Sequence, residues 1–231
     1  MAANSDANEK VLAARKSLEF IQDGMLLGLG SGSTVAALVP LLGERIRAGL
    51  RLQAVCASSY TRALAEQAGI PLLDEKAFQR LDLAIDGADE LDPALNAIKG
   101  GGGALLRERI VAAAADRFIL VADSRKPVAR LGQFPLPVEV TQFGWQSMAK
   151  KLAGLFPPTL RLDKATGQPF ISDEGNYILD CKTGPIADPV ALAARLSAMA
   201  GVMAHGLFIG MASLALIAHG DRVEVLQPRG S

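Results

Sequence analysis

Short apolar runs alternate with amphipathic stretches along the first half of the chain, and this alternation constrains the fold more than any other feature. Strand-like runs occur at residues 25–29, 52–56, 81–86 and 118–122. Helical spacing of apolar residues occurs at residues 10–21, 35–47, 60–68 and 104–115. Strands that alternate with helices favour a mostly parallel sheet with helices on both faces. We therefore predict an α/β fold with a Rossmann-like, doubly wound sheet.

The pattern changes near Gly132. The segment FPLPVEV at residues 134–140 has prolines beside apolar residues, which predicts an edge strand or a linker. Further strands are predicted at 159–162 and 177–181, helices at 145–155 and 189–199, and a turn-rich hairpin connection at 163–175. These elements predict a smaller α+β (ferredoxin-like) subdomain at residues 131–205. The catalytic α/β domain then comprises residues 1–130 and 206–231, and ends in strands at 212–217 and 222–226.

Charge and hydropathy argue against several classes of protein. The 231 residues include 24 basic and 24 acidic side chains, whereas nucleic-acid-binding proteins usually carry a basic excess. The longest apolar stretches, 35–42 and 211–218, are too short to span a bilayer. The first ten residues lack the apolar segment of a signal peptide, and the polar C-terminal QPRGS is predicted to be frayed. We expect a cytoplasmic protein without nucleic-acid or membrane partners.

The two cysteines, Cys56 and Cys181, are far apart in sequence and each lies among strand-like residues. This pattern favours buried thiols in a reducing compartment over a disulfide.

A turn rich in glycine and hydroxyl groups, GLGSGST at residues 28–34, separates the first predicted strand from a helix. Backbone N–H groups at a helix start, with the nearby hydroxyls, suit a phosphate ester. The dinucleotide fingerprint fails because its third glycine would be Ser33 or Val35, and no acid ends the second strand. No lysine precedes Ser33 and Thr34, as an ATP-binding loop requires. A phosphate site and a helix cap without a ligand remain the two interpretations.

The acidic turn DGADE, at residues 86–90, follows the third predicted strand, where open α/β sheets bind ligands. Its carboxylates suit sugar hydroxyl groups, which donate hydrogen bonds. A metal is a weaker interpretation because the chain has only two histidines, His205 and His219. A solvated acidic turn is the alternative.

Lys99 precedes four consecutive glycines, residues 100–103. Ordering four glycines loses much chain entropy, so an ordered loop here indicates close approach to a ligand, and a disordered linker is the alternative. Glu108 lies near the start of the next predicted helix, between Arg107 and Arg109. It is either a candidate base, together with the acids of residues 86–90, or a surface charge with an exposed ion pair.

The segments GLGSGST, DGADE, KGGGGALLRE and ADSRKPVARLGQFPLPVEV together resemble the type A ribose-5-phosphate isomerases in order, spacing and composition. The later EGNYILDCK and residues 189–201 extend the resemblance over nearly the whole chain. It implies an enzyme that interconverts D-ribose 5-phosphate and D-ribulose 5-phosphate through a cis-enediol(ate), in the non-oxidative branch of the pentose phosphate pathway. It also implies a homodimer or a dimer of dimers, without a cofactor or a catalytic metal.

The resemblance also implies roles for individual residues. The catalytic base falls on Glu108, and Asp86, Asp89 and Lys99 take part in catalysis, with ring opening assigned to neither aspartate in particular. Lys10 is a looser match to a lysine that reaches the phosphate, and Ser31 stands where many members have Thr. The substrate-binding residues fall on Ser31, Gly32, Ser33, Thr34, Asp86, Gly87, Ala88, Asp89, Lys99, Gly100, Gly101, Gly102 and Lys126.

Three other functions are compared with this interpretation. A non-catalytic sugar-phosphate-binding sensor domain would keep the phosphate turn but need no base, and no basic arm accompanies the chain. An acyl- or CoA-transferring enzyme would use a glutamate as nucleophile. A dehydrogenase is disfavoured by the failed fingerprint.

Overall fold

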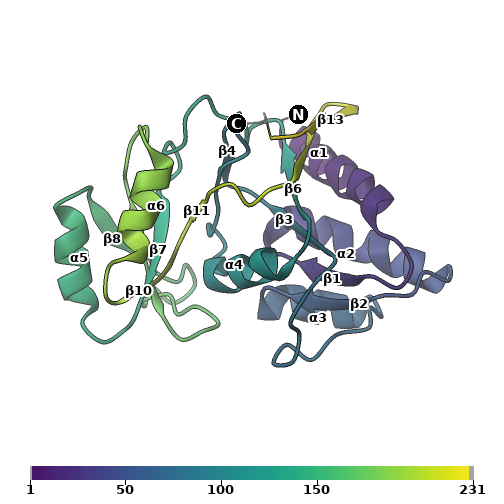
Figure 1. Cartoon of the computed structure of the whole chain (residues 1–231), viewed down its shortest axis with the longest axis horizontal. Helices are drawn as coiled ribbons and strands as arrows, with labels where there is room; N and C mark the ends of the chain where they lie inside the picture. The colour runs from purple at the N-terminus through teal and green to yellow at the C-terminus, as the bar shows by residue number, and fades with distance from the viewer. Residues whose placement is uncertain (1, 229–231) are drawn as a thin grey trace.

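The central feature of the computed structural model, which describes residues 2–228, is a six-stranded sheet of order β13-β12-β6-β3-β1-β2 (Figure 1). Its strands are β1 (Leu26–Leu29), β2 (Gln53–Cys56), β3 (Leu83–Gly87), β6 (Phe118–Asp123), β12 (Leu214–His219) and β13 (Arg222–Leu226). All neighbours pair in parallel except β12 and β13. The prediction of a mostly parallel sheet is confirmed. The last three residues of the C-terminal QPRGS lie outside the described residues.

Helices cover both faces of this sheet, as a doubly wound fold requires. One face carries α1 (Ala2–Ser17), the short 3₁₀ helix η1 (Leu18–Phe20), α2 (Gly32–Arg47) and α3 (Ser59–Gln67), and the other carries α4 (Leu105–Ala114). Side chains alternate across each strand. In β3, Ile85 therefore packs in the core beneath α2, while Ala84 packs in the core beneath α4.

A second, four-stranded antiparallel sheet lies beside the first, with order β10-β7-β9-β8 (Figure 1). Its elements are β7 (Leu136–Val140), α5 (Trp145–Ala153), β8 (Pro158–Leu160), β9 (Tyr177–Cys181), α6 (Pro189–Ser197) and β10 (Val202–His205). The βαββαβ chain order is that of a ferredoxin-like unit. All of these elements fall within residues 131–205, although the boundary of the domain itself stays a prediction.

Two predictions from the sequence are wrong, one about β7 and one about the first helix. β7 is not an edge strand, since it lies between β10 and β9. The strand accommodates Pro137 because the proline ring faces Gly206, which lies beyond the end of β10. The N–H that proline lacks is therefore not needed for pairing with β10. The first helix begins at Ala2 rather than at Lys10, because its polar first half carries no apolar periodicity.

A small three-stranded sheet joins the two larger sheets. It comprises β4 (Glu90–Leu91), β5 (Ala97–Ile98) and β11 (Leu207–Phe208), in the order β11-β5-β4. Gly206 connects β10 to β11. Its carbonyl accepts from the Lys99 N–H at 2.9 Å, and its N–H donates to the Pro137 carbonyl at 2.8 Å. Lys99 is thereby held at the junction of the sheets. Strands of two residues have no periodicity, which is why the sequence did not predict them.

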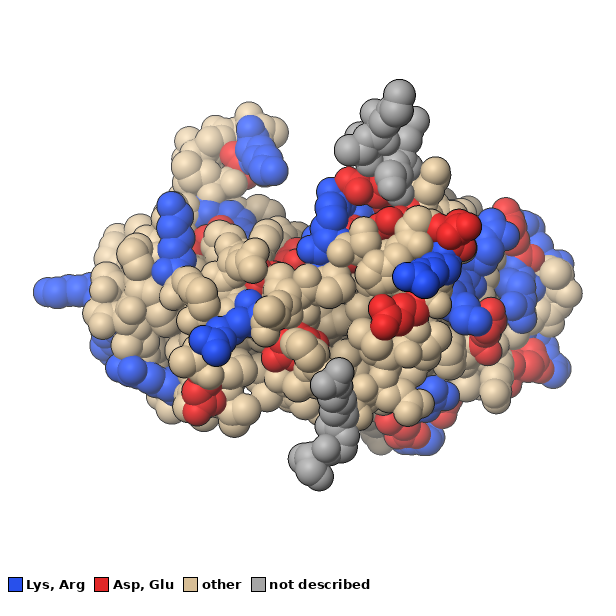
Figure 2. All heavy atoms as spheres, turned by 90° about the horizontal axis from the view of Figure 1, so that it is seen from above, with Lys and Arg blue, Asp and Glu red and all other residues tan. Residues whose placement is uncertain are grey.

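Surface charge and membrane-spanning potential offer no further guide to the site. Figure 2 shows Lys and Arg interspersed with Asp and Glu over the face it presents, so neither sign dominates there. None of the helices within residues 2–228 combines the length and the apolar character needed to cross a membrane. The distribution of charge on this face therefore does not indicate the position of a functional site.

Both cysteines are free and buried, which confirms the prediction of unpaired thiols. Burial raises the pKa of Cys56 and of Cys181 to about 12. Neither thiol is therefore ionised at neutral pH, and neither is a candidate nucleophile.

Replacement of Gly206 by alanine is expected to destabilise the junction. A Cβ at this position would lie 2.4 Å from the Lys99 carbonyl oxygen and 2.7 Å from Pro137 Cδ. Overpacking against backbone and a proline ring predicts a loss of about 1–3 kcal/mol in the free energy of unfolding. Chemical denaturation of the Gly206→Ala variant measures it. Gly154→Ala is the control, since its φ is −73° and its nearest new contact is 3.3 Å. Equal stability of the two variants would contradict the prediction.

Candidate active site

A single pocket gathers the predicted site residues where β1 and β3 end and α2 begins. Every predicted substrate-binding residue except Asp86 lines it, and so do Glu108 and Lys10. The full lining is Lys10, Ser31, Gly32, Ser33, Thr34, Gly87, Ala88, Asp89, Lys99, Gly100, Gly101, Gly102, Glu108 and Lys126. Lys126 is therefore not a plain surface lysine, and the looser match of Lys10 also falls at the site.

The glycine turn allows α2 to start directly above Asp86. A Cβ at residue 30 would lie 1.8 Å from Asp86 Cγ, so only glycine fits there. The Ser31 N–H donates to Asp86 Oδ1 at 3.0 Å, and the Ser31 hydroxyl donates to Glu108 Oε1 at 2.5 Å. Ser31 occupies the N-cap position of α2 but makes no side-chain cap hydrogen bond. Its hydroxyl donates to the Glu108 carboxylate instead, so the helix-cap interpretation is wrong for Ser31.

A buried cluster of three charges lies at the base of the pocket. Lys99 Nζ is 2.8 Å from Asp86 Oδ2 and 3.4 Å from Glu108 Oε2, and it donates to the Gly87 carbonyl at 2.6 Å. These three charged side chains are at most 4% exposed. Glu108 Oε2 accepts no hydrogen bond from any described residue. A buried carboxylate oxygen of this kind, beside a cation and in a residue that lines the pocket, is suited to accept a proton.

The electrostatics of the cluster shift the pKa of each aspartate upward. Burial, reinforced by the negative charge of Glu108, raises the pKa of Asp86 to about 7. Burial also raises the pKa of Asp89, against the opposing effect of the Gly101 N–H. For Lys99, burial alone would lower the pKa, but Asp86 and Glu108 outweigh it and the pKa is raised. The site therefore pairs a cation with one acid, Asp86, that exchanges protons near neutral pH and with a second, Asp89, whose pKa is shifted in the same direction.

The glycine run is an ordered wall of the pocket, and the disordered-linker interpretation is wrong. Gly100 and Gly103 have φ of +100° and +89°, which favour glycine. A Cβ at Gly103 would lie 2.5 Å from the Phe170 ring, and one at Gly101 would lie 2.7 Å from Asp89 Oδ1. Close approach to neighbouring groups therefore requires glycine at these positions.

The residues that flank the predicted site have structural roles. Glu90 is buried and accepts from the N–H groups of Gly132 and Phe134 at 2.7 and 2.5 Å, so it anchors the entry to the second sheet. Arg107 pairs with Glu174 at 2.5 Å rather than with Glu108. The guanidinium of Arg109 turns inward.

Arg109 supports the wall behind Lys99. Its guanidinium donates to the carbonyls of His205 and Leu207 at 2.5 and 2.7 Å and lies 4.4 Å from the centroid of the Phe208 ring. Lys99 Nζ is 5.4 Å from the same ring. The alternative given for Glu108, a surface charge with an exposed ion pair, is wrong, because Glu108 is buried and contacts Ser31 and Lys99 instead.

Sequence reasoning missed Glu9, which ties together the segments that carry the two pocket lysines. Its buried carboxylate accepts from the N–H and hydroxyl of Ser124 at 2.9 and 2.7 Å, and from the Gly220 N–H at 2.8 Å. The hydrogen bonds from Gly220 and Ser124 lower the pKa of Glu9. Lys10 is the next residue along α1, and Lys126 follows Ser124 by two positions. No local sequence signal marks these long-range contacts.

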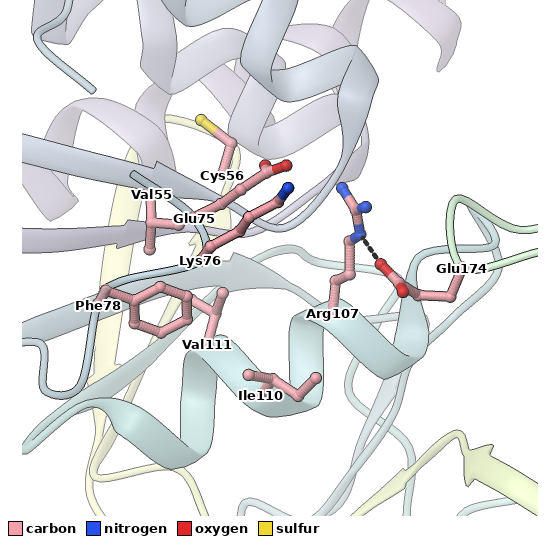
Figure 3. A pocket seen from close by; sticks show the side chains of 9 residues that line it. All are labelled: Val55, Cys56, Glu75, Lys76, Phe78, Arg107, Ile110, Val111 and Glu174. Atoms are coloured by element: carbon pink, nitrogen blue, oxygen red, sulfur yellow. Dashed lines mark hydrogen bonds and ion pairs between the residues drawn. The ribbon is translucent and has the colours of Figure 1, made fainter. Parts of the chain in front are cut away.

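A second hollow lies on the other side of α4 and contains none of the predicted residues (Figure 3). Its lining comprises Val55, Cys56, Glu75, Lys76, Phe78, Arg107, Ile110, Val111 and Glu174. Arg107 pairs with Glu174, as Figure 3 shows, and Glu75 pairs with Arg62 at 2.9 Å. Because these charges are neutralised and the thiol is un-ionised, the chemistry is assigned to the first pocket.

Fold and site together define an α/β protein with an enzyme-like pocket, in which lysines and a glycine-rich helix start lie beside a buried cluster of acids and a lysine. A sequence profile of ribose 5-phosphate isomerase A (phosphoriboisomerase A) matches residues 53–222. Proteins named ribose-5-phosphate isomerase A from Bradyrhizobium diazoefficiens and Roseiflexus castenholzii are 48% and 51% identical to this chain, over 94% and 93% of both chains. The chain belongs to the ribose 5-phosphate isomerase A family.

Solved structures agree with this assignment. A D-ribose-5-phosphate isomerase in complex with phospho-erythronic acid matches with a TM-score of 0.93 and 36% identity, covering 96% of this chain and 99% of the other. The ribose 5-phosphate isomerase A of Methanocaldococcus jannaschii matches with a TM-score of 0.91 and 33% identity, over 95% and 98% of the two chains. The fold expected from the sequence is confirmed.

The Glu9→Gln variant is expected to bind a phosphorylated sugar about tenfold more weakly, which corresponds to roughly 1.4 kcal/mol, because the anchor of both lysines is weakened. Isothermal titration calorimetry measures the dissociation constant. Glu19→Gln is the matched control, since Glu19 is exposed and pairs only with Lys16. A loss of affinity shared by both variants would argue against a role for Glu9.

The raised pKa of Asp86 predicts a pH-dependent stability. Because this pKa is about 7 in the folded protein and 3.8 ordinarily, the folded state binds more protons between these values. The stabilisation is fully present below about pH 4 and is lost as pH rises through about 7. The free energy of unfolding of the wild type, relative to Asp86→Asn, should therefore fall over this range. Urea denaturation of both proteins at several pH values measures it. A relative stability that rises with pH would show that the pKa is not raised.

Proposed function

We propose that the chain interconverts D-ribose 5-phosphate and D-ribulose 5-phosphate, with Glu108 as the acid/base that carries the proton. The observation that carries this proposal is the state of the Glu108 carboxylate. One oxygen is held by the Ser31 hydroxyl, while the other accepts no hydrogen bond from a described residue and lies 3.4 Å from Lys99 Nζ. Membership of the isomerase family supports the choice of substrate.

The substrate is proposed to lie with its phosphate at the start of α2. Ser33 and Thr34 follow the first residue of this helix, where backbone N–H groups are free, and Lys10 and Lys126 line the same pocket. The reacting carbons would then lie near Lys99 and Glu108. The structural relative that holds phospho-erythronic acid supports this arrangement, since that ligand carries a phosphate and a carboxylate and is therefore anionic at two places.

The proposed reaction moves one proton between adjacent carbons of the open-chain sugar. Glu108 removes the proton from C2, the C–H electron pair forms the C1–C2 double bond, and the carbonyl pair moves onto O1. Lys99 and the N–H groups of the glycine run stabilise the negative charge of this cis-enediolate. The proton of the C2 hydroxyl is transferred to O1, and Glu108 returns its proton to C1. Atoms and charge balance without an external redox partner.

We assign ring opening to Asp89 rather than to Asp86. Asp89 lines the pocket, where its carboxyl group is available to the ring oxygen of a bound sugar, and burial raises its pKa above the ordinary value. The oxygens of Asp86 are engaged by the N–H groups of Ser31 and Gly87 and by Lys99. The role that fits Asp86 is to orient Lys99 and to balance its charge.

We further propose that the enzyme is cytoplasmic, forms a homodimer or a dimer of dimers and needs neither cofactor nor metal. A sugar-phosphate-binding sensor would have no use for a buried base with a free oxygen. An acyl-transferring enzyme would use the same Glu108 as nucleophile, and a hydroxylamine-sensitive covalent intermediate would favour it.

The Glu108→Gln variant tests the proposal. We expect kcat to fall by about 10²–10⁴, because the proton carrier is lost, while phospho-erythronic acid binds within a few-fold of its wild-type affinity. Formation of ribulose 5-phosphate and exchange of substrate hydrogen with deuterated solvent, followed by NMR, measure the loss. Glu66→Gln on α3 is the control, since Glu66 is exposed and pairs with Arg62. Substantial isomerisation by Glu108→Gln would remove this residue from the role.

A further inference from the structure

We propose that Arg161 is a positioning residue for the isomerase reaction, which aims the peptide N–H groups of the glycine run into the pocket. The inference rests on the proposed function. Arg161 follows β8 in the second sheet, and its side chain reaches across to the glycine run. Its Nη1 donates to the Gly100 carbonyl at 2.9 Å and to the Gly101 carbonyl at 3.2 Å. One guanidinium thus holds two consecutive peptide planes.

The guanidinium is itself held rigidly. Asp180 on β9 accepts from Arg161 Nε at 2.9 Å and from Nη2 at 2.5 Å, which is a bidentate pair of fixed geometry. The Phe170 ring lies 6.0 Å from Arg161 Cζ and also packs against Gly103. The side chain of Arg161 is only 13% exposed, so it is not a mobile surface group. The second sheet therefore presents a preorganised cation to the glycine run.

Because the peptide group is planar, the contacts with Arg161 also set the directions in which the following N–H groups point. In a trans peptide the C=O and the following N–H point in opposite directions. The Gly100 carbonyl points to Arg161, and the Gly101 N–H accordingly points away from it and donates to Asp89 Oδ2 at 2.7 Å. By the same geometry, the Gly101 carbonyl turns the Gly102 N–H away from Arg161.

The Gly102 N–H is the group left for the substrate. Gly102 lines the pocket, and within residues 2–228 its N–H donates to no protein acceptor. A Cβ on Gly102 would lie 3.8 Å from the Ser31 hydroxyl, which is itself bonded to Glu108. Gly102 therefore lies beside the Ser31–Glu108 pair, and we place its free N–H where charge develops on the substrate oxygen. Arg161 also fixes the Gly101 N–H, which is the hydrogen-bond partner of Asp89. Both the proposed ring opening and the proposed proton transfer therefore depend on Arg161.

A glycine run needs an external clamp of this kind because its own side chains impose no conformation. Four consecutive glycines sample many backbone states, and donors that stabilise a transition state must be oriented before the reaction. Lys99 is fixed separately by Asp86 and by the Gly206 carbonyl. Loss of Arg161 should therefore disturb the N–H donors while leaving Lys99 in place.

The test is a comparison of Arg161→Ala, Arg161→Lys and Asp180→Asn with Arg195→Ala, an exposed arginine on α6. We expect kcat to fall about ten- to a hundredfold in Arg161→Ala, with smaller losses in Arg161→Lys and Asp180→Asn and none in Arg195→Ala. KM and the affinity for phospho-erythronic acid should change by less than about threefold, because the phosphate is held by other residues. Added methylguanidinium should restore part of the kcat of Arg161→Ala.

The outcomes separate this inference from the proposed function. If Arg161→Ala does not fold, Asp180→Asn and Arg161→Lys give the same comparison in a folded protein. A folded Arg161→Ala with wild-type kcat, or one in which only KM changes, would overturn the positioning role while the isomerase function stands. Absence of isomerase activity in the wild type, measured in the same assay, would overturn both.

Discussion

The burial of one ammonium group between two carboxylates is the interaction on which the rest of the structure depends. Lys99, Asp86 and Glu108 come from the end of β5, the end of β3 and the first turns of α4, and each is almost fully removed from water. Leaving any one of them unpaired in the interior would be strongly destabilising. The three segments must therefore meet in one arrangement, and the sheet order β6-β3-β1 and the junction at Gly206 provide it.

The same cluster carries an excess negative charge, and this excess has a chemical use. Two carboxylates beside one ammonium cannot both be ionised without repulsion, which contributes to the raised pKa of Asp86. A phosphorylated sugar brings further negative charge, so its phosphate must be neutralised elsewhere in the pocket. Lys10 and Lys126, which line the pocket from α1 and from the segment after β6, are the cations proposed for that role. On this proposal, the cations that bind the phosphate are separate from the charges that react.

The parts of this fold that could be predicted are those written in local patterns. The strands β3 and β6 and the three glycine-rich or acidic segments fall at the predicted places, because the alternating residues of β3, the apolar run of β6 and the composition of each segment are local signals. The position of β7 inside its sheet, the paired dipeptide strands and the anchor at Glu9 could not be predicted, since they depend on distant contacts. The bond from Gly220 to Glu9 spans 211 residues. Glu108 was singled out only by resemblance, because its arginine neighbours also fit a surface helix.

The two supports of the pocket come from different parts of the fold, and this has a mechanical consequence. Glu9 ties α1, which carries Lys10, to Ser124 and Gly220 beside the large sheet, whereas Arg161 ties the glycine run to the second sheet through Asp180. A small displacement of one sheet against the other would then misalign the N–H groups of the glycine run, while Lys10 and Lys126 stay in place. Such a displacement would act on the chemical step more than on binding, because only the donors that face developing charge would move. On this proposal the second sheet takes part in catalysis through Arg161, whose side chain donates to the backbone of the glycine run while Phe170 packs against Gly103.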